Sequence, residues 1–353
     1  MAHELTIEPL GVSIEVEEGQ TILDAALRHG IYLPHACGHG LCGTCKIEVR
    51  SGEVDIGNAN PFALMDFERE EGKALACCAT LRDDTVIEAD IEEEPDARII
   101  PVRDFEVRVS RIWDLTPTIK GVRLALDAPL DFQAGQYIQL AIPGLGETRA
   151  FSIANSPAEV RESGEIELNI RRVPGGMGTG YVHERLAEGQ SLSLSGPYGR
   201  FFVRKSARLP MIFMAGGSGL SSCQSMIRDL LEEGCTLPIT LIYGQRNRAE
   251  LYYDEELRAW AHDFPNFTYV PALSEERVEG GDVAQGFVHE VAERHFGGKF
   301  AGHKAYLCGP PPMIEAAVTS LMRGRLFERD IYFERFISAA DVQRLRSPLF
   351  KKI

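Results

Sequence analysis

The stretch Cys37-Gly38-His39-Gly40-Leu41-Cys42-Gly43-Thr44-Cys45 determines the fold of the N-terminal part of this chain. Its three cysteines have the C-x4-C-x2-C spacing with which a single loop ligates a 2Fe–2S cluster, and a fourth thiolate is expected later in the chain. Its three glycines allow unusual backbone angles and let N–H groups point at the sulfurs. We therefore predict that Cys37, Cys42 and Cys45 are cluster ligands.

Other metal sites fit this stretch less well. A zinc site would need a second Cys or Cys/His pair at suitable spacing, and none follows. A Rieske centre would use two histidines in place of two cysteines, and we interpret His35 and His39 as bystanders because three well-spaced cysteines are present. The fourth ligand is Cys77 or Cys78, since neighbours in an extended segment point to opposite faces and only one can reach the iron.

Length and composition indicate a globular protein of several domains. A chain of 353 residues is too long for one ordinary core, and 44% hydrophobic with 25% charged residues is typical of a globular protein. The longest apolar runs, such as Met211–Ala215, have the length of a strand and not of a membrane span. The first residues show no basic start followed by an apolar stretch, so we expect no secretory signal, and eight cysteines in so long a chain favour metal chemistry over disulfides. We expect a cytoplasmic protein with no membrane partner.

The net charge of −15 is concentrated at one end of the chain. Residues 1–95 contain 20 acidic and 6 basic side chains, a balance of −14. This excess is compatible with simple solubility and with a negative surface that steers docking onto a basic patch of a partner protein. Nucleic acid is not an expected partner of such a surface.

Periodicity predicts three domains, with boundaries at 1–96, 97–206 and 207–353. In the first, alternating residues on both sides of Gly11 indicate a hairpin, and Thr21 begins a short helix that ends at Gly30, so we expect a short mixed sheet with one helix. A charged segment, residues 92–96, then resembles a linker. Short alternating runs from 105 to 203 indicate an antiparallel barrel. After Arg208 the order strand, glycine loop, helix, strand indicates a parallel α/β sheet.

Arg149-Ala150-Phe151-Ser152 resembles the R-x-[YF]-[ST] flavin motif of the ferredoxin–NADP reductase superfamily. In that motif a guanidinium pairs with the pyrophosphate, an aromatic ring packs beside the flavin and a hydroxyl reaches its polar edge. Taken alone, these four residues would favour a strand with a surface arginine over a flavin site. Two later stretches follow the order of the superfamily: Gly175-Gly176-Met177-Gly178-Thr179, where helix amides and the Thr179 hydroxyl could hold phosphate, and Pro197-Tyr198-Gly199-Arg200-Phe201.

Two further motifs indicate a nicotinamide site. Ala215-Gly216-Gly217-Ser218-Gly219-Leu220-Ser221 follows a strand and opens a helix, where glycines let a pyrophosphate approach helix amides, although a plain tight turn would look similar. Cys308-Gly309-Pro310-Pro311-Pro312-Met313 matches the superfamily's C-G-P-x-x-M, whose alternative is a proline-capped helix with a buried cysteine. The superfamily usually has Pro where this chain has Ser222.

The choice of coenzyme depends on side chains after the second strand of the α/β sheet. Glu250 would suit the free ribose 2′-hydroxyl of NADH, whereas Arg246 and Arg248 would suit the 2′-phosphate of NADPH. We favour NADH.

With these motifs, the whole chain resembles the reductase components of bacterial multicomponent oxygenases, in particular the phenol hydroxylase reductases. Two stretches without an obvious chemical role look shared with the latter, residues 61–65 and 325–331. The resemblance implies a β-grasp 2Fe–2S ferredoxin-like domain, a flavin-binding barrel and a nicotinamide-binding α/β domain. It also implies NADH, FAD and a 2Fe–2S cluster as electron carriers, and an oxygenase component, of the diiron type for phenol hydroxylases, as acceptor.

The resemblance also implies residue roles. It selects Cys77 as the fourth ligand of the cluster, beside Cys37, Cys42 and Cys45. The residues implied at the reacting rings are Cys308, Ser152, Glu334 and Phe336. The residues implied in binding the cofactors are Arg149, Phe151, Ser152, Gly176, Gly178, Thr179, Pro197, Tyr198, Gly216, Gly217, Gly219, Glu250, Gly309 and Pro310.

Three other functions are alternatives to this one. A reductase for a ring-hydroxylating dioxygenase has the same three modules and differs chiefly in its partner. A non-catalytic redox-sensing iron–sulfur protein would not need a nicotinamide loop. A flavin monooxygenase acting directly on phenol would leave the iron–sulfur domain without a task.

Overall fold

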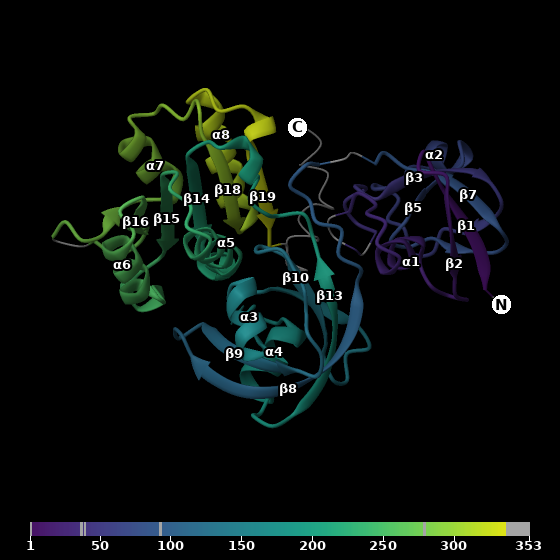
Figure 1. Cartoon of the computed structure of the whole chain (residues 1–353), viewed down its shortest axis with the longest axis horizontal. Coiled ribbons are helices and arrows are strands. Elements are labelled where there is room, and N and C mark those ends of the chain that lie inside the picture. Colours follow the sequence, from purple (N-terminus) through teal and green to yellow (C-terminus); the bar gives the residue numbers. More distant parts are fainter. Residues whose placement is uncertain (1, 36–37, 39, 92–93, 278–279, 337–353) are drawn as a thin grey trace. The chain divides into compact units, whose positions relative to one another are not determined.

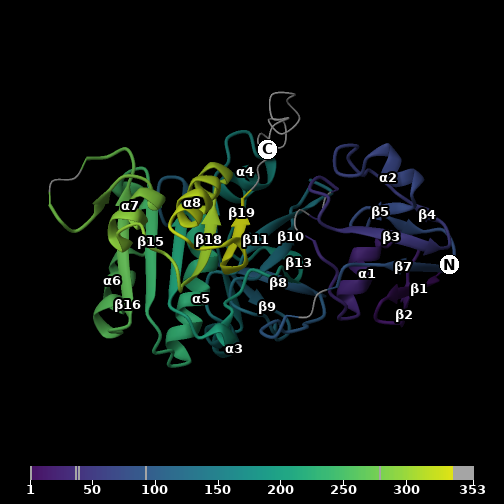
Figure 2. The ribbon, with the colours of Figure 1, turned by 90° about the horizontal axis from the view of Figure 1, so that it is seen from above.

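A computed structural model describes residues 2–35, 38, 40–91, 94–277 and 280–336 of the chain (Figures 1 and 2). It consists of two compact units, Met1–Arg103 and Asp104–Ile353. In the described part of the chain, no helix has both the length and the apolar character that crossing a membrane requires.

The first unit is built on a five-stranded mixed sheet with the strand order β2-β1-β7-β3-β5. The predicted hairpin is confirmed, because β1 and β2 are antiparallel with Leu5 opposite Ile14, both buried. The predicted helix is also confirmed, and the Thr21 side chain caps it by accepting a hydrogen bond from the Asp24 N–H at 3.2 Å. The strands of this sheet are β1 (His3–Glu8), β2 (Val12–Val16), β3 (Lys46–Ser51), β5 (Lys73–Leu75) and β7 (Thr85–Glu88), and the helix is α1 (Ile22–Arg28).

A second, smaller set of elements in this unit was not predicted. Strands β4 (Val54–Asp55) and β6 (Thr80–Leu81) form a two-stranded sheet, and a five-residue helix, α2 (Asp66–Glu70), has no buried residue. These elements are too short to show a period of apolar residues, so pattern alone cannot reveal them.

The second unit begins with the predicted antiparallel barrel. Its six strands follow the order β11-β10-β13-β8-β9-β12, and a bridge between Ile153 and Leu168 brings the two end strands together, so the barrel is nearly closed. Alternate residues of these strands fill its interior, among them Val107, Val109, Ile138 and Leu140, all at most 3% exposed. The elements are β8 (Arg103–Asp114), β9 (Ile119–Leu126), β10 (Tyr137–Ala141), β11 (Thr148–Ser152), α3 (Pro157–Ser163), β12 (Glu165–Arg171), α4 (Met177–Glu184) and β13 (Ser191–Tyr198).

The remainder of the second unit is the predicted α/β lobe, a six-stranded parallel sheet in the order β17-β16-β15-β14-β18-β19. Its strands are β14 (Met211–Gly216), β15 (Ile239–Gln245), β16 (Phe267–Leu273), β17 (Ala284–Gln285), β18 (Lys304–Gly309) and β19 (Ile331–Arg335). Its helices are α5 (Leu220–Glu232), α6 (Asp254–Asp263), α7 (Val288–Phe296) and α8 (Pro311–Arg323), with short 3-10 turns at Lys205–Ala207, Gly217–Gly219, Arg248–Glu250 and Glu328–Asp330.

Both faces of this sheet are covered by helices. Met211, Phe213 and Ala215 of β14 pack with α5 and α6, whereas Ile212 and Met214 pack with α7 and α8 on the opposite face (Figure 1). Burial on both faces is the reason why these strands are apolar at every position and not at alternate ones.

Candidate functional site

The strand order of the parallel sheet reverses direction between β14 and β18. From β14 the chain winds outward through β15 and β16, and it then returns to the other side of β14 as β18 and β19. Open parallel sheets bind ligands at the carboxyl ends of the strands where this direction reverses. In this sheet the two strands at that point are β14, which ends at Gly216, and β18, which ends at Gly309. They are paired with Ala215 opposite Cys308.

Side chains from three elements converge on Glu334 of β19 at this point. Oxygen Oε2 of its carboxylate accepts hydrogen bonds from the Ser222 hydroxyl at 3.1 Å and from the Ser152 hydroxyl at 3.2 Å. The Cys308 thiol lies 3.8 Å from the same oxygen. Ser152 ends barrel strand β11, Ser222 lies in the first turn of α5, and Cys308 is the register partner of Glu334 in the adjacent strand.

Burial sets the charge state of these groups. It raises the pKa of the Glu334 carboxyl to about 7, while the hydrogen bonds from Ser222, Ser152 and Cys308 favour the ionised form. Burial, and then the charge of Glu334, raise the pKa of the Cys308 thiol well above its usual value. Near neutral pH, Cys308 is therefore a neutral thiol beside a carboxylate that can be in either state.

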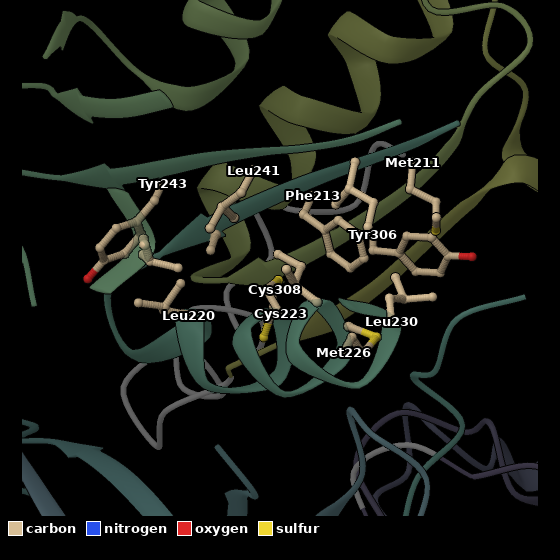
Figure 3. Close-up of a cluster of buried hydrophobic side chains, with 14 of the residues drawn as sticks. Met211, Phe213, Leu220, Cys223, Met226, Leu230, Leu241, Tyr243, Tyr306 and Cys308 are labelled. Atoms are coloured by element: carbon tan, nitrogen blue, oxygen red, sulfur yellow. The ribbon is translucent and has the colours of Figure 1, made fainter. Parts of the chain in front are cut away.

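The Cys308 side chain points into the layer between the sheet and α5. Figure 3 shows it beside Cys223, with Phe213 and Leu241 from the strands and Leu220 from the helix around them. Cys308 and Cys223 are both 0% exposed, and burial raises the pKa of the Cys223 thiol as well. Cys223 is thus a packed residue of this core.

The flavin motif lies on β11, at the edge of the barrel. The Arg149 side chain packs against Gly178 in the first turn of α4, where a methyl group on Gly178 would lie 2.9 Å from Arg149 Cγ. The Arg149 guanidinium is paired with Glu147 at 2.9 Å, and Phe151 packs at the margin of the barrel core. The structure therefore places Arg149 beside the N-terminus of the helix that the sequence selected.

The other residues expected to contact FAD lie close to these. Gly176 is the N-cap of α4, and the Thr179 hydroxyl accepts a hydrogen bond from the Val173 N–H at 3.0 Å, which closes the loop before the helix. Pro197 is buried near the end of β13, and the ring of Tyr198 stacks on that of Tyr137 with 5.6 Å between centroids.

The glycine loop after β14 packs directly on the C-G-P-P-P-M segment. Gly216 ends the strand, Gly217 begins a 3-10 turn, and Gly219 lies so close to β18 that a methyl group on it would be 2.3 Å from the Cys308 carbonyl oxygen. Only glycine fits at position 219, so the close packing on β18, and not only the turn, requires this residue. Gly309 and Pro310 follow directly in β18 and at the N-cap of α8.

Phe336 lies next to this segment. Its backbone N–H donates to the Gly309 carbonyl at 3.0 Å, and its ring is partly buried at the margin of the core between the sheet and α5.

Glu250 occupies a buried position between the two lobes of the second unit. It is 6% exposed, and its Oε2 accepts hydrogen bonds from Thr116 at 2.9 Å and from Thr118 at 2.6 Å in the β8–β9 turn. Arg248, in contrast, is exposed and paired with Asp282 at 3.2 Å. The Glu250 carboxylate, which the sequence analysis assigned to the ribose of NADH, is thus already hydrogen-bonded to two hydroxyls.

The cysteine loop of the first unit is described except for residues 37 and 39, so the predicted ligand Cys37 lies outside the described residues. Gly38, Gly40 and Gly43 have φ angles from +70° to +75°, as their place in a tight loop requires. Cys45 and Cys77 are brought together with their sulfurs 3.2 Å apart, and the Gly40 N–H points at the Cys77 sulfur at 3.2 Å. Cys42 is exposed, and within the described part of the chain no three metal-binding side chains are assembled.

The prediction that Cys77 and Cys78 face opposite ways is wrong for this chain. The two residues lie in a turn after β5, with the Cys78 N–H bonded to the Leu75 carbonyl, and not in an extended segment. Their sulfurs are consequently only 3.7 Å apart. Proximity to Cys45 nevertheless distinguishes Cys77 from its neighbour.

Sequence reasoning missed Ser222 as a member of the site. The sequence marks it only as a departure from the proline that the superfamily usually has, and its contact with Glu334 spans 112 residues. No other signal singles it out, because Ser221, Gln224 and Ser225 are also buried polar residues of α5.

A nearly closed flavin-type barrel, a parallel sheet with a glycine loop at its switch point, and a cysteine loop on a small mixed sheet together define an iron–sulfur flavoprotein reductase. Comparison with known families agrees with this class. Residues 5–82 match the 2Fe-2S iron-sulfur cluster binding domain, residues 106–203 the oxidoreductase FAD-binding domain, and residues 213–319 the oxidoreductase NAD-binding domain.

Full-length relatives are similar over all three domains. The chain is 58% identical to the phenol 2-monooxygenase reductase component DmpP of Pseudomonas sp. (strain CF600) and 57% identical to the phenol hydroxylase P5 protein of Acinetobacter pittii (strain PHEA-2), in each case over 100% of both chains. Its structure superposes on that of the Amycolatopsis cytochrome P450 reductase GcoB with a TM-score of 0.87 and 35% identity, covering 96% of this chain and 99% of the other. The chain belongs to the family of oxygenase reductase components that includes these phenol hydroxylase reductases.

Proposed function

We propose that this chain is the NADH-oxidising reductase component of a cytoplasmic, multicomponent diiron oxygenase that hydroxylates phenol or a similar aromatic ring. The observation that carries the reductase activity is the convergence of Ser152, Ser222 and Cys308 on Glu334 at the carboxyl end of the sheet. Full-length identity of 58% to a phenol 2-monooxygenase reductase component supports the choice of partner.

The chemistry is supplied by the three carriers. FAD takes two electrons from NADH as a hydride and releases them singly, and a 2Fe–2S cluster carries one electron at a time toward the oxygenase. The part of the protein is to hold these groups, to shape the charge around them and to exclude water.

Residues at the lobe boundary fit FAD and NADH. Arg149 would hold the pyrophosphate of FAD together with the N-terminal amides of α4, and Phe151 and Tyr198 would border the flavin ring. The loop from Gly216 to Gly219 would bring the pyrophosphate of NADH to the first turn of α5. The support for this arrangement is that each motif lies where its chain segment leaves a sheet or begins a helix.

Glu334 would act on the charge that develops during the reaction. As a hydride leaves NADH, the nicotinamide ring becomes positive, and an ionised carboxylate nearby stabilises that change. Cys308, which is neutral, would contribute shape and a weak hydrogen bond without adding a competing charge.

The thiols of the first unit fit a cluster in part. The separation of the Cys45 and Cys77 sulfurs is close enough for both to ligate one iron, and the Gly40 N–H directed at Cys77 is the kind of contact that stabilises a thiolate. Cys42 and Cys37 would complete the set.

An apolar patch beside the cysteine loop would be the contact surface for the oxygenase. It consists of Phe62, Met65 and Phe67, which are 76%, 50% and 54% exposed. The segment that carries them is anchored by buried Leu64 and by a hydrogen bond from the Asn60 N–H to the Gly40 carbonyl. The acidic excess of residues 1–95 would orient this patch toward a basic partner surface.

Reconstitution with purified oxygenase components tests the proposal. The chain, loaded with iron, sulfide and FAD, is mixed with NADH, oxygen, phenol and either a diiron phenol hydroxylase or a Rieske dioxygenase. We expect catechol formation and coupled NADH consumption only in the mixture that contains the diiron phenol hydroxylase. Turnover only with the Rieske dioxygenase would refute the proposed partner, and catechol formed without any partner would refute an electron-transfer role.

A further inference from the structure

Three serines of helix α5 are almost completely buried, and their hydroxyls have different partners. The Ser221 hydroxyl donates to the Ser218 carbonyl at 2.9 Å, and the Ser225 hydroxyl donates to the Asn155 carbonyl at 2.8 Å. The Ser222 hydroxyl, on a residue that is 0% exposed, donates instead to the carboxylate of Glu334 at 3.1 Å. Ser222 is therefore the one of these three whose hydroxyl donates to a carboxylate.

The position of Ser222 complements that of Ser152. Ser152 comes from the barrel and Ser222 from the α/β lobe, and both donate to the same oxygen, Oε2 of Glu334. The Cys308 sulfur is 3.8 Å from both the Ser222 hydroxyl oxygen and Oε2 of Glu334, so the thiol, the hydroxyl and the carboxylate form one cluster. A carboxylate held by donors from two sides has less freedom to turn away from a ring bound against it.

We propose that Ser222 is a positioning residue of the reductase reaction, which orients the Glu334 carboxylate and favours its ionised form. This inference rests on the proposed function of Glu334. A hydroxyl that donates to a carboxylate favours its charged form, so removal of the hydroxyl makes ionisation of Glu334 harder. The described titratable groups that face this carboxylate are the thiols of Cys308 and Cys223, and both remain neutral in the pH range concerned.

The first test measures protonation of Glu334 directly. The infrared band of its protonated carboxyl, identified by its loss in Glu334→Gln, is titrated in full-length holoprotein without NADH. We expect the midpoint of wild-type protein near pH 7 and that of Ser222→Ala about one pH unit higher, because a hydrogen bond to a charged group typically contributes that much. Ser222→Thr, which keeps the hydroxyl, should return the midpoint to the wild-type value.

The second test measures flavin reduction by NADH as a function of pH in the same proteins. A midpoint higher by about one unit leaves roughly a tenth of the carboxyls ionised at pH 7 instead of half, so the rate of Ser222→Ala should fall about fivefold there and recover at higher pH. The matched control is Ser225→Ala, the same change one turn along the helix, which should leave the midpoint unshifted.

The outcomes separate this inference from the proposed function. If wild-type flavin is not reduced by NADH at any pH, the proposed function fails. If it is reduced but Ser222→Ala titrates with the wild-type midpoint, or if Ser222→Thr shifts as far as Ser222→Ala, the positioning role of Ser222 is refuted. Ser222→Cys, a weaker donor of nearly equal size, provides the same comparison should the alanine variant lose FAD, and its midpoint should move in the same direction.

Discussion

The hydroxyl of Ser152 lies 3.2 Å from Oε2 of Glu334, although 182 positions separate the two residues in the chain. One residue ends a barrel strand and the other lies near the end of the last strand of the parallel sheet. Their contact joins the two lobes of the second unit at the end of the flavin motif.

Replacement of Glu334 by Gln should remove the pH dependence of flavin reduction by NADH. In wild-type protein the carboxyl, whose pKa burial raises to about 7, ionises as pH rises, so the rate should increase through that value. Above pH 7 the variant should reduce flavin about tenfold to a hundredfold more slowly than wild-type protein, since its side chain cannot become charged. Stopped-flow absorption measures the rate, with exposed Glu328→Gln as control. A pH dependence that persists in Glu334→Gln would assign the titration to another group.

Replacement of Cys77 by Ser should abolish the cluster, whereas Cys78→Ser should retain it. The two thiols are neighbours, but Cys77 is the one whose sulfur contacts that of Cys45. Iron and sulfide content and the visible spectrum report the outcome, and FAD content should be unchanged in both variants because the second unit is untouched. A cluster that survives Cys77→Ser and is lost in Cys78→Ser would make Cys78 the ligand.

Replacement of Phe62 by Ser should impair delivery of electrons to the oxygenase without slowing flavin reduction. Loss of the most exposed large side chain of the apolar patch should raise the KM for the oxygenase about tenfold. Reduction of ferricyanide by NADH provides the internal reference. Leu10→Ser, a similar change at a residue 45% exposed beyond β1, is the matched control. Equal KM values for the two variants would show that this patch is not part of the docking surface.

Replacement of Gly219 by Ala should destabilise the second unit. The added methyl group would lie 2.3 Å from the Cys308 carbonyl oxygen, and two backbone segments would have to move apart. We expect a loss of about 3 kcal/mol in the free energy of unfolding, visible as a lower Tm. Gly281→Ala, where the added methyl group meets nothing within 4 Å, should be nearly neutral. An unchanged Tm for Gly219→Ala would mean that this packing can relax without cost.

Much of the architecture could be predicted because local patterns determine it. The hairpin around Gly11, the helix capped by Thr21 and the change from barrel to parallel sheet after Arg208 all depend on neighbours in sequence. The short elements β4, β6 and α2 could not, because two to five residues do not establish a period.

Within the site, motifs located single residues but not their contacts. The C-G-P-x-x-M spacing identifies Cys308, whereas its pairing with Glu334 depends on the register of two parallel strands joined through α8. Ser222 escapes prediction for the same reason, since a helix residue reveals its partner only after the helix packs on the sheet. The opposite orientation expected for Cys77 and Cys78 failed because a turn, and not a strand, carries them.

Electrons from NADH should pass through a flavin to a 2Fe–2S cluster within this one chain. Anaerobic stopped-flow absorption of the purified holoprotein mixed with NADH tests this route most directly. We predict loss of flavin absorbance within the first turnover, followed by loss of cluster absorbance, with both retained when NADH is omitted. A protein whose flavin and cluster absorbance do not change on addition of NADH would contradict the route.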